Sequence, residues 1–126
     1  MSVSEVEGIP AKYVAAWHEP DADLRRKVID ELWAEECSYH NSGASFRGRS
    51  GIAEAVTEAH DAFIKNGFVF TVAKVDVTQD AVRYQWEMVP EGGGDLAAVG
   101  THVFTVDGDG KIVTDYQFVD LAVTQD

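Results

Sequence analysis

Hydrogen-bonding and titratable side chains gather in the segment CSYHNSGASFRG at residues 37–48, where a short strand is expected to end. Tyr39 and Asn41 can hydrogen-bond to a carbonyl or hydroxyl group, and His40 can change its charge near neutral pH. Because side chains two residues apart in a strand share a face, either Tyr39 and Asn41 or His40 points inward. The segment therefore predicts a polar site floor and leaves open which of these groups forms it.

His102 is the second candidate, and it shares the face of its strand with Gly100 and Phe104. A histidine can act as a general base near neutral pH, although a lone histidine on an apolar face is more often a hydrogen-bonded core residue. In the last strand, alternation puts Asp115 and Gln117 on one face. Whichever face of that strand points inward, at least one carboxylate or amide faces the space that the sheet encloses.

The elements that must position these groups follow from the hydrophobic periodicity. Apolar residues at three- and four-residue spacing predict helices over residues 5–18, about 21–34 and 52–65. The predicted buried stripe of the second helix is Leu24, Val28, Leu32 and Trp33. From Phe68 onward the period is two, which predicts strands at about 68–77, 81–90, 96–106 and 111–121. Helices followed by antiparallel strands predict an α+β domain with the helices on one face of the sheet.

Length and charge narrow the classes of function. The chain has 126 residues, 45% of them hydrophobic, which predicts a single domain over residues 1–126. Acidic residues outnumber basic ones by 22 to 10, so nucleic acid and anionic membranes are disfavoured as partners. The N-terminal stretch has neither a basic nor an apolar targeting region, which predicts a cytoplasmic protein. One cysteine and four histidines without ligand-pair spacing predict no disulfide, no metal and no cofactor.

Three strings of the sequence carry a resemblance to a known superfamily. They are KYVAAWHEPDADLRRKVIDELWAEECSYHNS at residues 12–42, GRSGIAEAV at 48–56 and GTHVFTVDGDGKIVTDYQFVD at 100–120. In their order and spacing the chain resembles the nuclear transport factor 2-like superfamily, which includes ketosteroid isomerases, limonene epoxide hydrolase, scytalone dehydratase and the SnoaL-like polyketide cyclases. The resemblance implies a cone-shaped curved antiparallel sheet, three N-terminal helices that enclose a pocket, and a homodimer.

The resemblance also assigns roles to residues. By comparison with the ketosteroid isomerases, Tyr13 matches the oxyanion-hole tyrosine, Asn41 the general base and His102 the protonated acid of the oxyanion hole. It favours the arrangement in which Tyr39 and Asn41 point inward. The implied pocket residues are Trp17, Tyr39, His60, Phe63, Tyr84, Trp86, Met88, Phe104, Asp115 and Gln117.

An amide cannot abstract a proton, so Asn41 cannot replace the general base, and His102 becomes the titrating group. We therefore expect a small-molecule pocket protein that acts as an acid/base enzyme on a hydrophobic, ring-containing molecule. The sequence does not decide whether the reaction is an isomerisation, a dehydration, a cyclisation or a hydrolysis. The alternatives are a non-catalytic ligand-binding module and a dimeric interaction domain that uses the outer sheet face with Arg83, Gln85 and Glu87.

Overall fold

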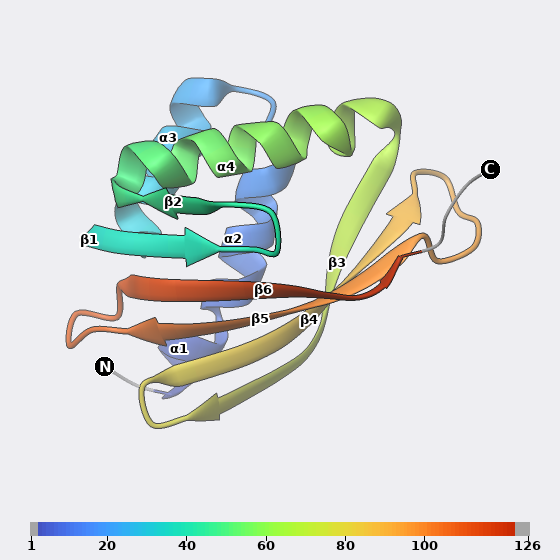
Figure 1. Cartoon of the computed structure of the whole chain (residues 1–126). Coiled ribbons are helices and arrows are strands. Elements are labelled where there is room, and N and C mark those ends of the chain that lie inside the picture. The colour runs from blue at the N-terminus through green and yellow to red at the C-terminus, as the bar shows by residue number, and fades with distance from the viewer. Residues whose placement is uncertain (1–2, 123–126) are drawn as a thin grey trace.

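The computed structural model describes residues 3–122 (Figure 1). Its helices are α1 (Val3–Glu7), α2 (Ile9–His18), α3 (Ala22–Leu32), α4 (Gly48–Ala62) and the short 3-10 helix η1 (Ile64–Asn66). Its strands are β1 (Trp33–His40), β2 (Ser45–Arg47), β3 (Phe68–Thr78), β4 (Ala81–Pro90), β5 (Ala98–Val106) and β6 (Ile112–Ala122). The α+β class and the four predicted strands after residue 67 are confirmed.

The six strands form one open, curved sheet in the order β2-β1-β6-β5-β4-β3. All neighbouring pairs are antiparallel except β1 and β6, which run parallel. The four predicted strands are thus antiparallel as expected, and the parallel pairing of β1 with β6 makes the whole sheet mixed. β1 comes before α4 and the long hairpins, so its place beside the last strand is reached by a crossover and not by a turn.

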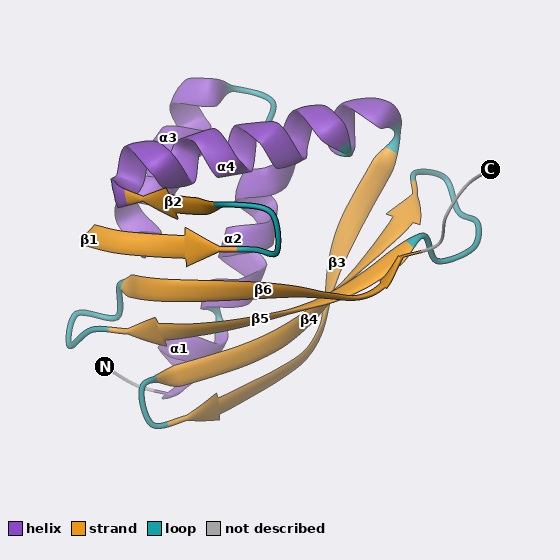
Figure 2. Ribbon diagram, viewed as in Figure 1, coloured by secondary structure: helices purple, strands orange, loops and turns teal. Residues whose placement is uncertain are grey.

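The helices lie on the concave side of this sheet (Figure 2). Figure 1 shows that the sheet is curved and that one end of β3 lies beside the C-terminal end of α4. The first predicted helix is two helices, because the chain is interrupted at Gly8 and Pro10 lies in the first turn of α2. α2 buries Tyr13 and Trp17 against the sheet, as its periodicity predicted.

α3 differs from its prediction at both ends of the buried stripe. Leu24 is 49% exposed, and Trp33 is the buried first residue of β1 and not part of the helix. The buried face is Arg25, Ile29 and Leu32, so Leu32 is confirmed while Arg25 and Ile29 take the places predicted for Leu24 and Val28. Arg25 is buried because its Nη1 donates to the Glu19 carbonyl just after α2, which joins the two helices.

Asp21 begins α3 as the sequence predicted, because its side chain accepts hydrogen bonds from the backbone N–H groups of Asp23 and Leu24. Asp21→Ala is expected to lower the free energy of unfolding by about 1 kcal/mol, the usual cost of losing such a cap. Urea unfolding followed by circular dichroism measures the change. Asp21→Asn keeps the acceptor and should stay close to the unchanged protein. An equal loss in both variants would contradict a hydrogen-bonded cap.

The segment after β1 is more ordered than the expected loop. Residues Ser45–Arg47 form β2, which pairs with β1, and α4 starts at Gly48 and not near residue 52. The Arg49 Nε donates to the Trp33 carbonyl at 3.0 Å, so this residue is a structural contact and not a solvated loop charge. The helix end is as predicted, since Gly67 closes η1 with a φ of 89°.

The outer face of the sheet carries Arg83, Gln85 and Glu87, as strand alternation predicted. It also carries Tyr116 and Phe118 on β6, which are 48% and 56% exposed. Within residues 3–122 no helix has the length and apolar character that crossing a membrane requires.

Candidate functional site

A cavity of about 400 Å³ lies between the concave face of the sheet and helices α2 and α4. Its lining consists of Tyr13, Trp17, Tyr39, Ile52, Ala55, Val56, Ala59, Phe63, Phe70, Trp86, Met88, Ala97, Ala98, Gln117 and Val119. None of these lining side chains carries a charge, and six of them are aromatic. Such a surface accommodates an uncharged, ring-containing molecule.

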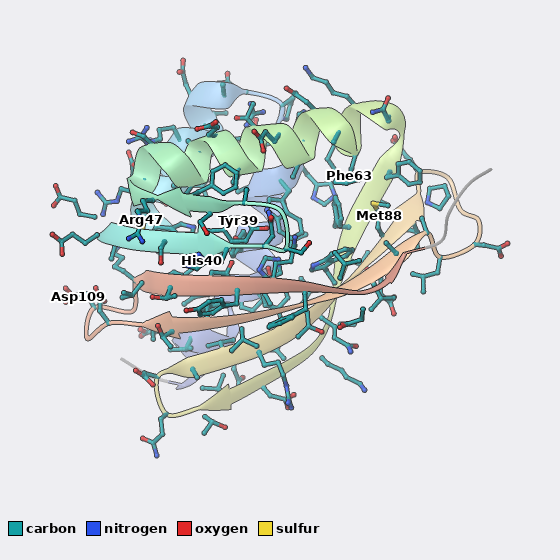
Figure 3. The ribbon with its side chains drawn as sticks, in the orientation of Figure 1. Tyr39, His40, Arg47, Phe63, Met88 and Asp109 are labelled. Atoms are coloured by element: carbon teal, nitrogen blue, oxygen red, sulfur yellow. The ribbon has the colours of Figure 1, made fainter. Side chains whose placement is uncertain are left out.

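The polar and apolar parts of the lining are separated along the cavity. Phe63 and Val119 are 39% and 56% exposed, so they mark its mouth. Figure 3 shows Phe63 and Met88 at this end, where α4 gives way to β3. The phenols of Tyr13 and Tyr39 are buried, so the hydrogen-bonding groups lie deeper in the fold.

A chain of three buried polar side chains lies at the deep end. The Tyr13 hydroxyl donates to Asp115 Oδ2 at 2.7 Å, and His102 Nδ1 lies 2.8 Å from the same oxygen. His102 and Asp115 are both completely buried. The two residues come from adjacent antiparallel strands, whereas Tyr13 comes from α2, so the chain joins the sheet to the helical layer.

The hydrogen bonds determine the chemistry of His102. Because the Asp115 carboxylate is an acceptor, Nδ1 carries a hydrogen, and in the neutral imidazole Nε2 is the nitrogen with the free lone pair. Nε2 is buried and has no hydrogen-bond partner among the described residues. The arrangement matches that of a general base whose second nitrogen is oriented by a carboxylate.

Four aromatic rings surround the His102 imidazole. Tyr84 stacks on it with ring centroids 5.0 Å apart, and Tyr39 lies nearly parallel at 6.1 Å. Tyr13 and Trp17 approach at 5.3 and 5.5 Å. Tyr13, Trp17 and Tyr39 also line the cavity, so one layer of rings separates His102 from it.

The buried tyrosines remain protonated donors. Burial raises the pKa of the Tyr13 phenol well above its ordinary value, and the negative charge of Asp115 raises it further. Burial likewise raises the pKa of Tyr84 well above its ordinary value and that of Tyr39 to about 12. These phenols can donate hydrogen bonds throughout the neutral range.

Tyr39 points into the cavity and His40 points away from it. His40 stacks on Tyr116 of the outer face, with ring centroids 5.0 Å apart. Asn41 lies past the end of β1, where its Oδ1 accepts from the backbone N–H groups of Gly43 and Ala44. Its Nδ2 donates to the Tyr39 hydroxyl at 3.4 Å. Asn41 therefore holds the turn and orients Tyr39, whose O–H can still donate to a ligand.

The structure divides the candidate residues into two groups. Tyr13, Trp17, Tyr39, Phe63, Trp86, Met88 and Gln117 line the cavity. His102, Asp115, Tyr84 and Phe104 are buried beside it, and Asn41 lies at the turn. His60 lies outside the lining. Its Nδ1 donates to the Trp17 carbonyl at 2.7 Å and so satisfies a backbone acceptor in the last turn of α2. No group of three His, Cys, Asp or Glu residues within 3–122 could hold a metal ion.

Some lining residues were missed from the sequence. Ala55 and Ala59 of α4 leave room for the cavity, and Ile52 and Val56 complete that wall. The four-residue spacing of the two alanines was visible, but small residues on a helix more often mark close packing than a cavity wall.

The curved sheet, the helices on its concave face and the enclosed cavity define a nuclear transport factor 2-like domain. Residues 11–114 match the SnoaL-like domain family, and the chain belongs to that family. No curated protein sequence matches the chain.

Solved structures have a similar fold. A SnoaL-like family protein of Agrobacterium tumefaciens, described as a candidate isomerase, is 29% identical with a TM-score of 0.84, over 94% of this chain and 100% of that one. A candidate ketosteroid isomerase from Kribbella flavida is 16% identical with a TM-score of 0.70, over 98% and 83% of the two chains. A candidate polyketide cyclase from Sinorhizobium meliloti is 19% identical with a TM-score of 0.69, over 94% and 100%.

Proposed function

We propose that this SnoaL-like protein is an acid/base enzyme that transfers a proton within an uncharged, hydrophobic, ring-containing small molecule. The proposal is supported above all by the unpartnered Nε2 of His102. A buried polar atom without a partner costs about 1–3 kcal/mol, so native proteins rarely keep one without a use. Here it is the lone pair of an imidazole whose other nitrogen is held by Asp115.

The surrounding atoms add to this support. The structure describes four buried side-chain nitrogen or oxygen atoms without a partner, and three of them belong to Tyr84, Trp86 and His102. These three side chains lie on the concave face of β4 and β5, beside the cavity. Unused hydrogen-bonding capacity is thus concentrated where a ligand would bind.

The chemistry is a proton shift. His102 Nε2 takes a proton from an acidic C–H of the ligand, the electron pair of that bond moves to the ligand's carbonyl oxygen, and an enolate forms. The Tyr39 O–H hydrogen-bonds the enolate oxygen. The imidazolium, stabilised by Asp115, then returns the proton to the same or to another carbon, which exchanges or isomerises the ligand. No oxidant, reductant or metal takes part. For the ligand to reach Nε2, the rings of Trp17 and Tyr39, which border both His102 and the cavity, have to move aside.

A non-catalytic ligand-binding module is the second candidate. It is favoured by the complete burial of His102, which is not among the residues that line the cavity. In this alternative the Tyr13–Asp115–His102 chain only stabilises the fold, and the apolar cavity binds its ligand unchanged.

Deuterium exchange separates the two candidates without knowledge of the natural substrate. Fused-ring neutral ketones are incubated with the protein in D₂O, and the loss of their α-protons is followed by NMR. We expect exchange faster than in buffer, reduced at least about 100-fold in His102→Asn. Asparagine keeps an N–H for Asp115 but has no nitrogen in the place of Nε2.

Met88→Leu is the control, because it alters the cavity wall and leaves the polar chain intact. It should keep most of the exchange. Equal exchange in the protein and in His102→Asn would remove His102 from the chemistry. Binding of the ketones without any exchange would establish the binding module instead.

A further inference from the structure

The Trp86 indole occupies a space that is open only because residue 100 is a glycine and has no Cβ atom. Trp86 of β4 lies directly opposite Gly100 of β5. A Cβ atom added to Gly100 would lie 2.2 Å from Cζ2, 2.3 Å from Cε2 and 2.7 Å from Nε1 of the indole. Real Cβ atoms essentially never come this close to another heavy atom. The indole therefore lies against the bare backbone of β5.

The same indole is part of the cavity wall. Trp86 lines the cavity, whereas Gly100 beneath it does not. His102 follows Gly100 by two residues, so the two positions share the concave face of β5. Without the indole, the cavity would extend to the backbone at Gly100 and along β5 toward His102.

Edge contacts hold the indole in place without a side-chain hydrogen bond to its N–H. Phe70 and Trp17 meet its ring at 82° and 85°, with centroids 5.3 and 6.5 Å away. Its Nε1 is buried and unpartnered. A buried tryptophan N–H usually finds an acceptor, so a purely structural role explains this position poorly. Turning the indole away from Gly100 would break no hydrogen bond of its side chain.

We propose that Trp86, seated on Gly100, is the size-selecting residue of the cavity and limits the length of the uncharged, fused-ring ketone that it binds. The inference rests on the proposed function in that the cavity binds such a molecule, but it requires no proton transfer. A volume of about 400 Å³ lies near the lower end of the range for ligand pockets, about 300–1,000 Å³. The uncharged lining and the net charge of −12 exclude an anionic ligand. A smaller side chain at position 86 extends the cavity toward Gly100, so the longer of two fused-ring ketones gains the more from it.

Binding of two homologous ketones tests the proposal. The ligands are tetralone, with two fused rings, and tetrahydroanthracenone, with three, and their dissociation constants are measured by ligand-observed NMR. In Trp86→Leu the preference should shift toward the three-ring ketone by at least about tenfold, the usual scale of discrimination by pocket size. Phe104→Leu is the matched control, because it removes a buried ring that does not line the cavity and leaves the indole on Gly100. Its preference should not change.

Gly100→Ala tests the same contact from the other side. The added methyl group must push the indole into the cavity, so the affinity for tetralone should fall about tenfold or more. The double variant Gly100→Ala/Trp86→Leu should recover binding, which a general loss of folding could not do. Thermal unfolding checks that each variant is folded.

Equal shifts in Trp86→Leu and Phe104→Leu, or no recovery in the double variant, would overturn the size-selecting role. Failure of every variant to bind either ketone would overturn the ligand class. Both results are read from binding alone. Absence of deuterium exchange would disprove the proposed enzyme activity but would not affect the size-selecting role. An unchanged preference in Trp86→Leu would disprove the size-selecting role but would not affect the exchange result.

Discussion

Asp115→Ala is expected to lower the free energy of unfolding by about 3–5 kcal/mol, the cost of removing one partner from a buried polar pair. The carboxylate is completely buried and accepts from both the Tyr13 hydroxyl and the His102 ring. Without it, two buried donors lose their acceptor at once, and neither can turn to water. Denaturant unfolding of the variant and of the unchanged protein measures the difference.

Asp120→Ala is the matched control, because Asp120 is an exposed carboxylate on the same strand that accepts from the Thr101 hydroxyl on the outer face. Its cost should stay within about 0.5 kcal/mol. A double-mutant cycle of Tyr13→Phe with Asp115→Asn should give a coupling energy of about 0.5–3 kcal/mol. Additive losses would show that the 2.7 Å contact between these residues contributes nothing of its own.

Alkaline pH is expected to unfold the protein through its buried tyrosines. Burial raises the pKa of Tyr39 from 10.0 to about 12 in the folded state. Between these pH values the unfolded chain loses the phenolic proton while the folded one keeps it. Stability from this group is therefore fully present below pH 10 and is lost as the pH rises to about 12. Two pKa units correspond to about 3 kcal/mol.

Tyr13 and Tyr84 act in the same direction, because burial raises the pKa of each well above its ordinary value. The experiment uses Tyr116→Phe, so that the near-ultraviolet tyrosinate absorbance reports only the three buried phenols. We expect tyrosinate formation and loss of circular dichroism to coincide above pH 10. Tyrosinate that forms near pH 10 in a protein that keeps its native spectrum would contradict the burial of these side chains.

The sequence was sufficient to predict which side chains of β4 and β5 share a face of the sheet. Alternation alone placed His102 beside Gly100 and Phe104 on an enclosed face, and the structure buries His102 and Phe104 there. It also separated Trp86 from the outer face that carries Arg83 and Gln85. These predictions succeeded because a period of two depends only on residues near one another in the chain.

The parts that could not be predicted depend on contacts between distant segments. Alternation left both faces of the last strand open, and Asp115 is placed inward by its bonds to Tyr13, 102 residues earlier, and to His102. Trp33 fitted the helical period, but the pairing of β1 with β6 draws it into a strand. Asn41 was given a place in the site by resemblance, and local hydrogen bonds hold it in a turn instead. The homodimer stays a prediction.

The parallel pairing of β1 with β6 also affects how the chain can fold. Trp33 pairs with Ile112 and Tyr39 with Asp115, so the centre of the sheet joins residues from opposite ends of the sequence. During synthesis on a ribosome, the β3–β5 hairpins can form early, but β1 has no partner on that side until β6 emerges. Closing such a long loop is slow and raises the contact order of the fold. Until then, the Trp33 and Tyr39 side chains lie on a strand with one open edge, the stage at which a chaperone would protect this protein from aggregation.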